Sequence, residues 1–529
     1  MRQNRINMET KGAIMNKQDA GTFTPFSPSL HANVATIRDR FGGSTDIVIR
    51  MFRSDAAPDR EIAIIYVDGI VDSETINESV MEPLMSMKLP QHAYVKGGKL
   101  LDALRGCVVS IGSVLTINTL EQALQFMTDG LCVIMADGST EALMADVGGG
   151  EQRSVTIPQT QTVIRGPQHG FVESIRTNIS LIRRIIRSSD LHVQMHKIGR
   201  QTHTNVAVLY LHGIVDEGIV KEVYRRLADI DIDGVLESGY IEEFIQDETF
   251  TLFPTMLNSE RPDTVAAALL EGRVAVMIDG SPMALMAPTT FFTFFQSPED
   301  YYQRFDIATF VRLIRYGAYV VSIVLPALYI AVTTYHQEML PTTLLISLAA
   351  QREGIPFPGL VEALLMELTF EVLREAGLRM PRAIGPAISI VGALVLGQSA
   401  VQAGIVSAGM VIIVSFTAIS NFVMPEFNMA ATSRIIRFLF MIMAGIFGFF
   451  GIFISVLFML IHLTSLRSFG VPYMSPMAPG PTKQGPWRDV FIRLPWWAVV
   501  LRPLDLNLRN PKRRPNGKKP PAQRHSDKA

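Results

Sequence analysis

An uncharged run from Ala383 to Pro425 limits what this chain can fold into more than any other feature. The run contains no Asp, Glu, Lys or Arg. As a single helix it would be about 64 Å long at ~1.5 Å per residue, whereas the apolar core of a bilayer is only about 30 Å thick and takes about 20 residues. We therefore expect two membrane spans, near Ile384–Gln402 and Ile405–Met424, that fold back on each other at Gly404.

Two further uncharged stretches, Tyr316–Tyr335 and Phe438–Ile461, complete a predicted bundle of about four spans. Residues 339–350 are apolar but too short to cross, so we expect them at the membrane interface or in a re-entrant segment. An amphipathic helix over 359–376 is an alternative fifth membrane-embedded helix. The expected fold class is thus an α/β cytoplasmic domain followed by an all-α polytopic membrane bundle.

Charge sets the expected orientation of this bundle. Arg312 and Arg315 precede the first span, and a basic, Pro-rich tail from Leu508 follows the last. Both flanks favour the cytoplasm, where the tail is expected to be disordered and to touch anionic membrane lipid rather than nucleic acid. The first 21 residues lack the apolar segment of a signal peptide, which agrees with cytoplasmic termini. Arg434 and Arg437 fit this topology less well, because it places them outside.

The part of the chain before about residue 310 contains an internal repeat. Residues 62–72 (IAIIYVDGIVD) recur as 206–216 (VAVLYLHGIVD), and 133–139 (VIMADGS) recur as 275–281 (AVMIDGS). The offsets are 144 and 142 residues, and the two blocks keep the same order. This indicates two related α/β modules rather than a solenoid, which needs more copies.

Each module is predicted to open with a buried strand and a helix and to close with two short strands joined at an Asp-Gly turn, which needs φ > 0. Asp72 and Asp216 occupy the same place in both copies and are interpreted as helix N-caps, with a ligand site as the alternative. A helix is expected over Phe171–Arg187. The predicted organisation is a disordered tail over 1–40, module 1 over 41–160, a helical connector over 161–200, module 2 over 201–310, the membrane bundle over 311–465, and a cytoplasmic segment over 466–529.

Three carboxylates lie on one face of the predicted helix over 359–376. Glu367, Glu371 and Glu375 follow one another at four-residue spacing, which places them side by side. Carboxylates beside a bilayer usually face water, a partner or an ion path. One interpretation is a ring of carboxylates at the mouth of a cation pore built from several copies. The alternative is an ordinary surface helix with a Glu371–Arg374 pair.

Polar side chains also interrupt the uncharged double span. The candidates for pore lining are Gln398, Ser399, Gln402, Ser415 and Asn421. Gln398 and Gln402 share a helix face at four-residue spacing. The alternative interpretation is routine packing, in which polar side chains hydrogen-bond across neighbouring helices.

Catalytic and metal-binding motifs find no support in the sequence. It contains no phosphate-binding Walker loop, no HExxH, no Gly-x-Ser-x-Gly and no cluster of Cys and His. The two cysteines, Cys107 and Cys132, are far apart and are expected to be ordinary buried thiols. We therefore expect neither an enzyme nor a bound cofactor or metal.

Several short segments, taken in order, resemble one known family. They include Ile164-Arg165-Gly166-Pro167, Phe253-Pro254-Thr255, Gln296-Ser297-Pro298-Glu299-Asp300-Tyr301-Tyr302, Pro356-Phe357-Pro358 and Pro381-Arg382-Ala383-Ile384-Gly385. In this order they resemble the A subunit of GerA-type spore germination receptors, including the related SpoVAF-type proteins. The resemblance runs from about Gly42 to Val471.

The resemblance implies a role in the germination of dormant endospores, in the inner spore membrane. It implies a transporter-like B subunit and a lipoprotein C subunit as partners. It also implies that A subunits form a homo-oligomeric ring that conducts ions, while the B subunit senses the nutrient. The alternatives are a non-conducting scaffold and a SpoVAF-type accessory channel. The family supplies no catalytic residues, so the candidate site residues rest on spacing alone.

Overall fold

The computed structural model describes residues 23–54, 57–85, 104, 114–149, 158, 161–379, 395, 397–477, 489–502 and 509–513. The chain forms two compact units, of which the second contains all described helices after residue 213.

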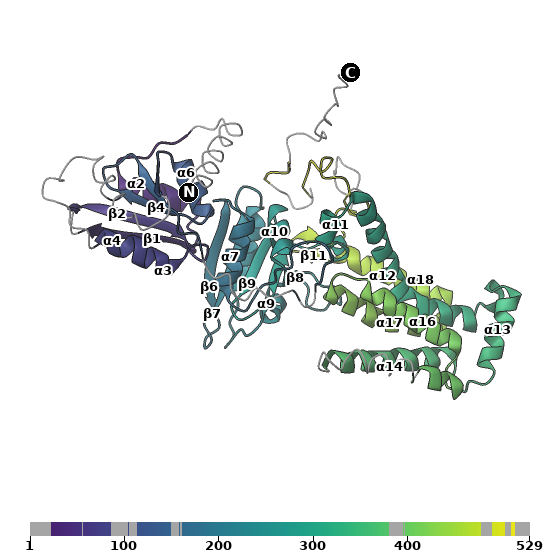
Figure 1. The fold of residues 1–529 in the computed structure, drawn as a ribbon. Helices are drawn as coiled ribbons and strands as arrows, with labels where there is room; N and C mark the ends of the chain where they lie inside the picture. The colour runs from purple at the N-terminus through teal and green to yellow at the C-terminus, as the bar shows by residue number, and fades with distance from the viewer. Residues whose placement is uncertain are drawn as a thin grey trace, which may run out of the picture. The chain divides into compact units, whose positions relative to one another are not determined.

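The first α/β module is built on a five-stranded antiparallel sheet in the order β1-β2-β4-β5-β3 (Figure 1). Its strands are β1 (Ile47–Ser54), β2 (Ala57–Val67), β3 (Val114–Ile117), β4 (Cys132–Ala136) and β5 (Ala142–Ala145). Its helical elements are α2 (Leu30–Arg40), α3 (Ser73–Thr75), the π-helical η1 (Ile76–Met81), α4 (Glu82–Met85) and α6 (Leu120–Thr128). The β2 and β4 strands carry continuous apolar runs because both of their faces are buried.

The second module repeats this topology with the strand order β6-β7-β9-β10-β8. Its strands are β6 (Leu191–Ile198), β7 (Thr204–Leu211), β8 (Leu257–Ser259), β9 (Val274–Ile278) and β10 (Ala284–Ala287). Its helices are α7 (Ile175–Ile185), α8 (Glu217–Ala228), α9 (Ser238–Ile245) and α10 (Pro262–Leu270). The registers agree as well, since Met135 pairs with Ala142 in one copy and Met277 with Ala284 in the other. The predicted duplication is therefore confirmed.

Equivalent turns and caps lie at equivalent places. Gly138 and Gly280 follow β4 and β9 with φ of 80° and 87°, the left-handed region that the Asp-Gly turn requires. Asp72 accepts a hydrogen bond from the backbone N–H of Glu74 at the start of α3, and Asp216 accepts one from Gly218 at the start of α8. The N-cap interpretation of both aspartates is confirmed.

The structural repeat begins before residue 41, where module 1 was predicted to start. Asn33 in α2 and Asn178 in α7 each bracket the residue six positions before them, accepting from its N–H and donating to its carbonyl. The predicted helix over 171–187 is thus the second copy of α2 and not a separate connector. The predicted disordered tail over 1–40 is wrong for residues 23–40, because α2 buries Leu30 and Ile37. These buried apolar side chains hold α2 against the rest of module 1.

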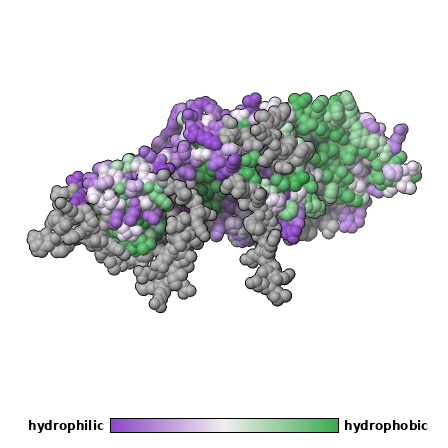
Figure 2. All heavy atoms as spheres, turned by 90° about the horizontal axis from the view of Figure 1, so that it is seen from above, coloured by the Kyte–Doolittle hydropathy of each residue, from purple (hydrophilic) through white to green (hydrophobic). Residues whose placement is uncertain are grey.

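The helices after module 2 carry the apolar part of the chain. They are α12 (Phe305–Thr334), α13 (Thr342–Arg352), α14 (Gly359–Arg379), α16 (Ala408–Phe422), α17 (Phe427–Phe447) and α18 (Phe449–Ser465). Among the described residues, α12 and α17 are long and apolar enough to cross a membrane, while α16 and α18 are apolar but shorter. Figure 2 shows hydrophobic side chains gathered over the surface of this helical part. Most of the span expected over 384–402 lies outside the described residues.

The span predicted over Phe438–Ile461 is wrong as a single helix. Gly448 has a φ of 60° and ends α17, after which α18 begins. The two helices pack against each other as a hairpin. Uncharged sequence continues through this turn, so composition could not reveal it.

The contacts at the two ends of α17 show where along the bundle Arg434 and Arg437 lie. The Gln161 amide, which bonds with Ser259 of β8, also donates to both carboxylate oxygens of Glu426 at the start of α17, at 3.0 and 3.2 Å. At the opposite end of the bundle, the Tyr335 hydroxyl after α12 donates to the carbonyl of Gly445. The first half of α17 therefore lies beside module 2, so its two arginines are not at the far end.

Candidate functional site

Two glutamates of α14 form ion pairs with two arginines of α17. Glu367 Oε2 lies 2.7 Å from Arg437 Nη1, and both side chains are fully buried. One turn further, Glu371 Oε2 lies 2.6 Å from Arg434 Nη1, and these side chains are about one fifth exposed. We call these four residues the α14–α17 ladder. Charges of opposite sign at this distance neutralise each other and fix the two helices in register.

The ladder fixes the direction of α14. Glu371 follows Glu367 along α14, whereas its partner Arg434 precedes Arg437 along α17. The two helices are therefore antiparallel, and the C-terminal end of α14 lies beside the start of α17. Glu375, the third predicted carboxylate, lies one turn closer to that end, is exposed, and pairs with Arg379 of its own helix at 2.7 Å.

Hydrogen bonds of the ladder are incomplete. Within the described part of the chain, the second carboxylate oxygen of Glu367 and the Nε of Arg437 are buried without a hydrogen-bond partner. Glu371 Oε1 lies 3.9 Å from Arg437 Nη2, which is an electrostatic contact but not a hydrogen bond. Buried charges in this state cost free energy that the ion pair only partly offsets.

The predicted polar residues of the double span separate into two groups. Gln398, Ser399 and Gln402, in a helical segment over 397–402, are exposed, and so is Ser415 of α16. Asn421 is buried, and its side-chain amide lies 2.8 Å from the Ser433 hydroxyl of α17. With its nitrogen toward Ser433, its oxygen accepts from Arg374 Nη1 of α14 at 3.3 Å. Asn421 therefore crosslinks helices of the same chain.

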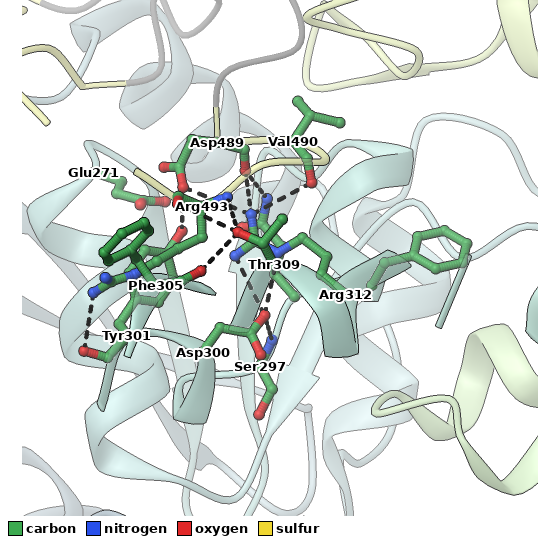
Figure 3. Close-up of polar contacts among 12 residues, drawn as sticks. Glu271, Ser297, Asp300, Tyr301, Phe305, Thr309, Arg312, Asp489, Val490 and Arg493 are labelled. Carbon is green, nitrogen blue, oxygen red and sulfur yellow. Dashed lines mark hydrogen bonds and ion pairs between the residues drawn. The ribbon is translucent and has the colours of Figure 1, made fainter. Parts of the chain in front are cut away.

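A second buried charge cluster joins module 2 to α12 (Figure 3). Asp300 lies in α11 (Glu299–Tyr302), which directly precedes α12. Both of its carboxylate oxygens lie 2.8 Å from Arg315 Nη1, and its Oδ2 lies 3.3 Å from Arg312 Nη2. All three residues are buried. We call this group, together with Asp489, the α12 junction.

The C-terminal segment completes this junction. The backbone carbonyl of Asp489 accepts from Arg312 Nη1 at 2.6 Å and from the Gln296 amide at 2.9 Å. The Tyr301 hydroxyl donates to the Asp489 carboxylate at 3.2 Å. Burial raises the pKa of Asp489, and nearby Arg312 opposes this rise. The junction thus ties three segments together: the end of module 2, the start of α12 and the chain after residue 488.

Aromatic rings surround the junction. The Phe295 ring stacks on Tyr316 at 4.4 Å, and Phe491 of the C-terminal segment lies 4.8 Å from the same Tyr316. Phe295 lies in the 3-10 helix η4 (Phe291–Phe295), which follows β10. These rings exclude water and so strengthen the ion pairs that they enclose. The rings therefore pack the end of module 2 and the C-terminal segment against the start of α12.

Arg312 and Arg315 were predicted only as basic residues that precede the first span on the cytoplasmic side. In the structure both are buried against Asp300, a pairing that the sequence did not predict. The signal available was the acidic Glu299-Asp300 pair just before two arginines spaced three apart. Residues 509–513 of the basic tail also make contacts with module 2, since Arg509 lies 2.9 Å from Glu217 and Arg513 lies 3.2 Å from Glu271.

The described residues hold no cluster of three or more His, Cys, Asp or Glu side chains that could bind a metal. Cys132 is buried in β4, and burial raises the pKa of its thiol well above the ordinary value. His212, which replaces Asp68 of the first copy, stacks on His192 with ring centroids 5.1 Å apart.

Comparison with known proteins identifies the family. The Bacillus/Clostridium GerA spore germination protein family matches residues 35–504. Because this match covers most of the sequence, the chain belongs to the GerA family.

Several relatives match over most of their length. Spore germination protein KA of Bacillus subtilis (strain 168) is 50% identical, over 90% of this chain and 86% of that protein. Uncharacterized membrane protein YfkQ of the same strain is 42% identical, over 90% and 91%. Spore germination protein GerLA of Bacillus cereus is 38% identical, over 91% and 96%. These names denote germination and membrane proteins, and none denotes an enzyme.

One solved structure is also similar in sequence. The crystal structure of the N-terminal domain of the A subunit of the Bacillus megaterium spore germinant receptor GerK3 is 36% identical. It matches 51% of this chain and 99% of that domain, with a TM-score of 0.42.

Proposed function

We propose that this chain is the A subunit of a nutrient-responsive spore germination receptor, and that several copies assemble into a ring that conducts ions to start germination. Membership of the GerA family supports the role in germination. The proposal includes a multi-pass location in the inner spore membrane with both termini in the cytoplasm. It also includes a transporter-like B subunit and a lipoprotein C subunit as partners.

One observation carries the ion-conducting part of this proposal: polar side chains are exposed on an otherwise apolar bundle. Gln398, Ser399 and Gln402 are exposed, and Gln402 lies two residues before the turn at Gly404. Uncompensated polar groups are costly in lipid, so such a face is expected to meet water or another protein surface. One chain packs its described helices against each other, and a water-filled path therefore needs several copies.

The carboxylates of α14 would contribute unequally to a pore mouth. In the proposed ring, Glu367, Glu371 and Glu375 face the end of the bundle beside module 2. Arg437 and Arg434 already neutralise the first two. Glu375 is exposed and its arginine partner is also exposed, so its charge is the most available to a passing cation.

The same ladder favours a second candidate function, a non-conducting scaffold. A helix whose carboxylates are bound to a neighbouring helix is suited to fixing the shape of a subunit, and Asn421 adds a further crosslink. In that case the exposed Gln398 and Gln402 would contact a partner subunit and not water. The two candidates predict different ion fluxes.

Ion flux from liposomes separates them. Purified full-length protein is reconstituted into potassium-loaded liposomes, and efflux is compared for the native chain, Gln402→Leu and the control Gln351→Leu. Gln351 is an exposed glutamine on α13. A channel predicts efflux from the native protein, a severalfold loss for Gln402→Leu and no loss for Gln351→Leu. Absence of efflux from correctly assembled native protein would reject conduction and support the scaffold.

A further inference from the structure

The loop between α9 and β8 lies against the ends of α17 and α18. The Thr251 hydroxyl lies 2.9 Å from His462 Nε2 of α18, and the Thr432 hydroxyl of α17 donates to the carbonyl of Leu252. The Phe253 ring is buried with its centroid 6.0 Å from that of His462. This loop of module 2 is therefore held beside α17 and α18 by its own contacts.

The outward face of the same loop is apolar. Along residues 250–253 the side chains alternate, with Thr251 and Phe253 toward the helices and the other two directed away. Phe250 is 94% exposed and Leu252 is 48% exposed. Phe244, at the end of α9, is also exposed. Neighbouring large apolar side chains left outside a well-anchored segment mark an interaction surface.

The position of the loop along the helices indicates what it meets. Thr432 lies five residues beyond the start of α17, or about 7.5 Å at ~1.5 Å per residue. His462 lies three residues before the end of α18, or about 4.5 Å by the same rise. The loop therefore lies alongside the first turns of α17 and the last turn of α18. At this level the outward residues Phe427, Ile435 and Ile461 of the two helices are more than half exposed.

We infer that Phe250 and Leu252 insert into the boundary between headgroups and acyl chains of the bilayer and anchor module 2 to the membrane surface. The inference rests on the proposed membrane bundle, whose apolar outer face the two residues continue. Thr432 and His462, which the loop contacts, lie about 5–8 Å from the helix ends at ~1.5 Å per residue, a distance comparable to the ~5–10 Å to which interfacial apolar groups are buried.

The anchoring is hydrophobic and not electrostatic. Asp247 and Glu248 precede Phe250, and acidic side chains are not attracted to anionic lipid. Asp247 is also engaged within the protein, since its carboxylate contacts Arg226 at 2.5 Å. We therefore expect insertion in bilayers of neutral phosphatidylcholine, without a requirement for anionic lipid.

Spin-label accessibility tests the insertion. A nitroxide is attached at Phe250→Cys in the full chain carrying Cys107→Ser and Cys132→Ala, reconstituted in phosphatidylcholine nanodiscs. Collision rates with oxygen, which concentrates in lipid, and with a water-soluble nickel complex are compared with two references. Phe458→Cys reports the exposed face of α18, and Glu248→Cys reports the exposed polar side of the same loop. We expect the oxygen-to-nickel ratio at position 250 to be severalfold above that at 248.

Each other outcome has a separate meaning. A ratio at position 250 equal to that at 248, with a lipid-like value at 458, overturns the anchor and leaves the membrane bundle intact. Low collision with both reagents, together with dipolar broadening between labels, means that a second copy covers Phe250 and also overturns the inference. A water-like value at 458 as well rejects the membrane bundle of the proposed function itself.

Discussion

The α12 junction and the α14–α17 ladder both bury charged side chains, but they satisfy them differently. At the junction, Asp300 meets two arginines, and Arg312 also donates to a backbone carbonyl. In the ladder, Glu367 and Arg437 share one short contact, and each retains a buried polar atom without a hydrogen bond among the described residues. The junction joins three segments of the chain, whereas the ladder joins two helices.

This difference predicts that the two clusters differ in strength. At the junction, one carboxylate meets two arginines and a backbone carbonyl adds a further contact, although Arg312 Nη2 is buried without a hydrogen bond among the described residues. In the ladder, Glu367 and Arg437 are joined by a single short contact, so we expect the ladder to be the weaker of the two.

The largest expected effect is at the junction. Asp300→Asn leaves two buried arginines without their shared counter-charge and should lower the free energy of unfolding by about 3–5 kcal/mol. Thermal unfolding of the detergent-solubilised full chain measures this. Asp306→Asn is the control, because Asp306 is exposed in a local pair with Arg304, and it should leave the midpoint unchanged. Equal midpoints for native and Asp300→Asn proteins would show that the junction is not a structural connection.

The ladder should be weaker and replaceable. Glu367→Gln should cost about 2–4 kcal/mol, because Arg437 stays buried with only the distant Glu371 charge. The double variant Glu367→Leu with Arg437→Leu should recover most of that loss, since an apolar pair needs no hydrogen bonds. The same unfolding assay is used. If the double variant is as unstable as Glu367→Gln, an apolar pair cannot replace the ion pair, and the ladder is as essential to folding as the junction.

The smallest effect concerns Glu426, a buried carboxylate with no arginine partner among the residues that the structure describes. Burial raises the pKa of Glu426 to about 8, with Gln161 hydrogen bonds opposing the rise. Between the ordinary value of 4.5 and about 8 the folded chain therefore binds a proton that the unfolded chain has released, so stability falls as pH rises through this window. Glu426→Gln should remove this dependence. The gain in free energy of unfolding of the variant over the native chain should be about 1–3 kcal/mol larger at pH 9 than at pH 6.

The control for this titration is Glu338→Gln, since Glu338 is exposed after α12. Its unfolding midpoint should follow pH as the native chain does. If Glu426→Gln keeps the native pH dependence, the pKa of Glu426 is not raised in the folded chain. Glu426 would then be ionised and paired with a counter-charge, as the buried carboxylates of the junction and the ladder are.

Part of the architecture could be predicted from local sequence. The repeat in 62–72 and 206–216 predicted two modules, and the strand order of both sheets confirms them. Asp72 and Asp216 were predicted as N-caps because a cap acts within three residues of itself. The earlier repeat unit that Asn33 and Asn178 mark was missed, although the asparagines stand 145 residues apart. Sequence similarity there is too sparse to stand out.

The sequence by itself determined that the chain has two related α/β modules, a long apolar part and membership of the GerA family, because strand periodicity, uncharged runs and short ordered segments are local properties. Only the tertiary structure decided which charges meet. Glu371 and Arg434 are 63 residues apart, and Glu367 and Arg437 are 70 residues apart. Spacing placed the three glutamates on one face of α14, but the turn at Gly448 and the direction of α17 determine what that face contacts. A helix face is a property of one segment, whereas its counter-charge depends on how the whole bundle packs.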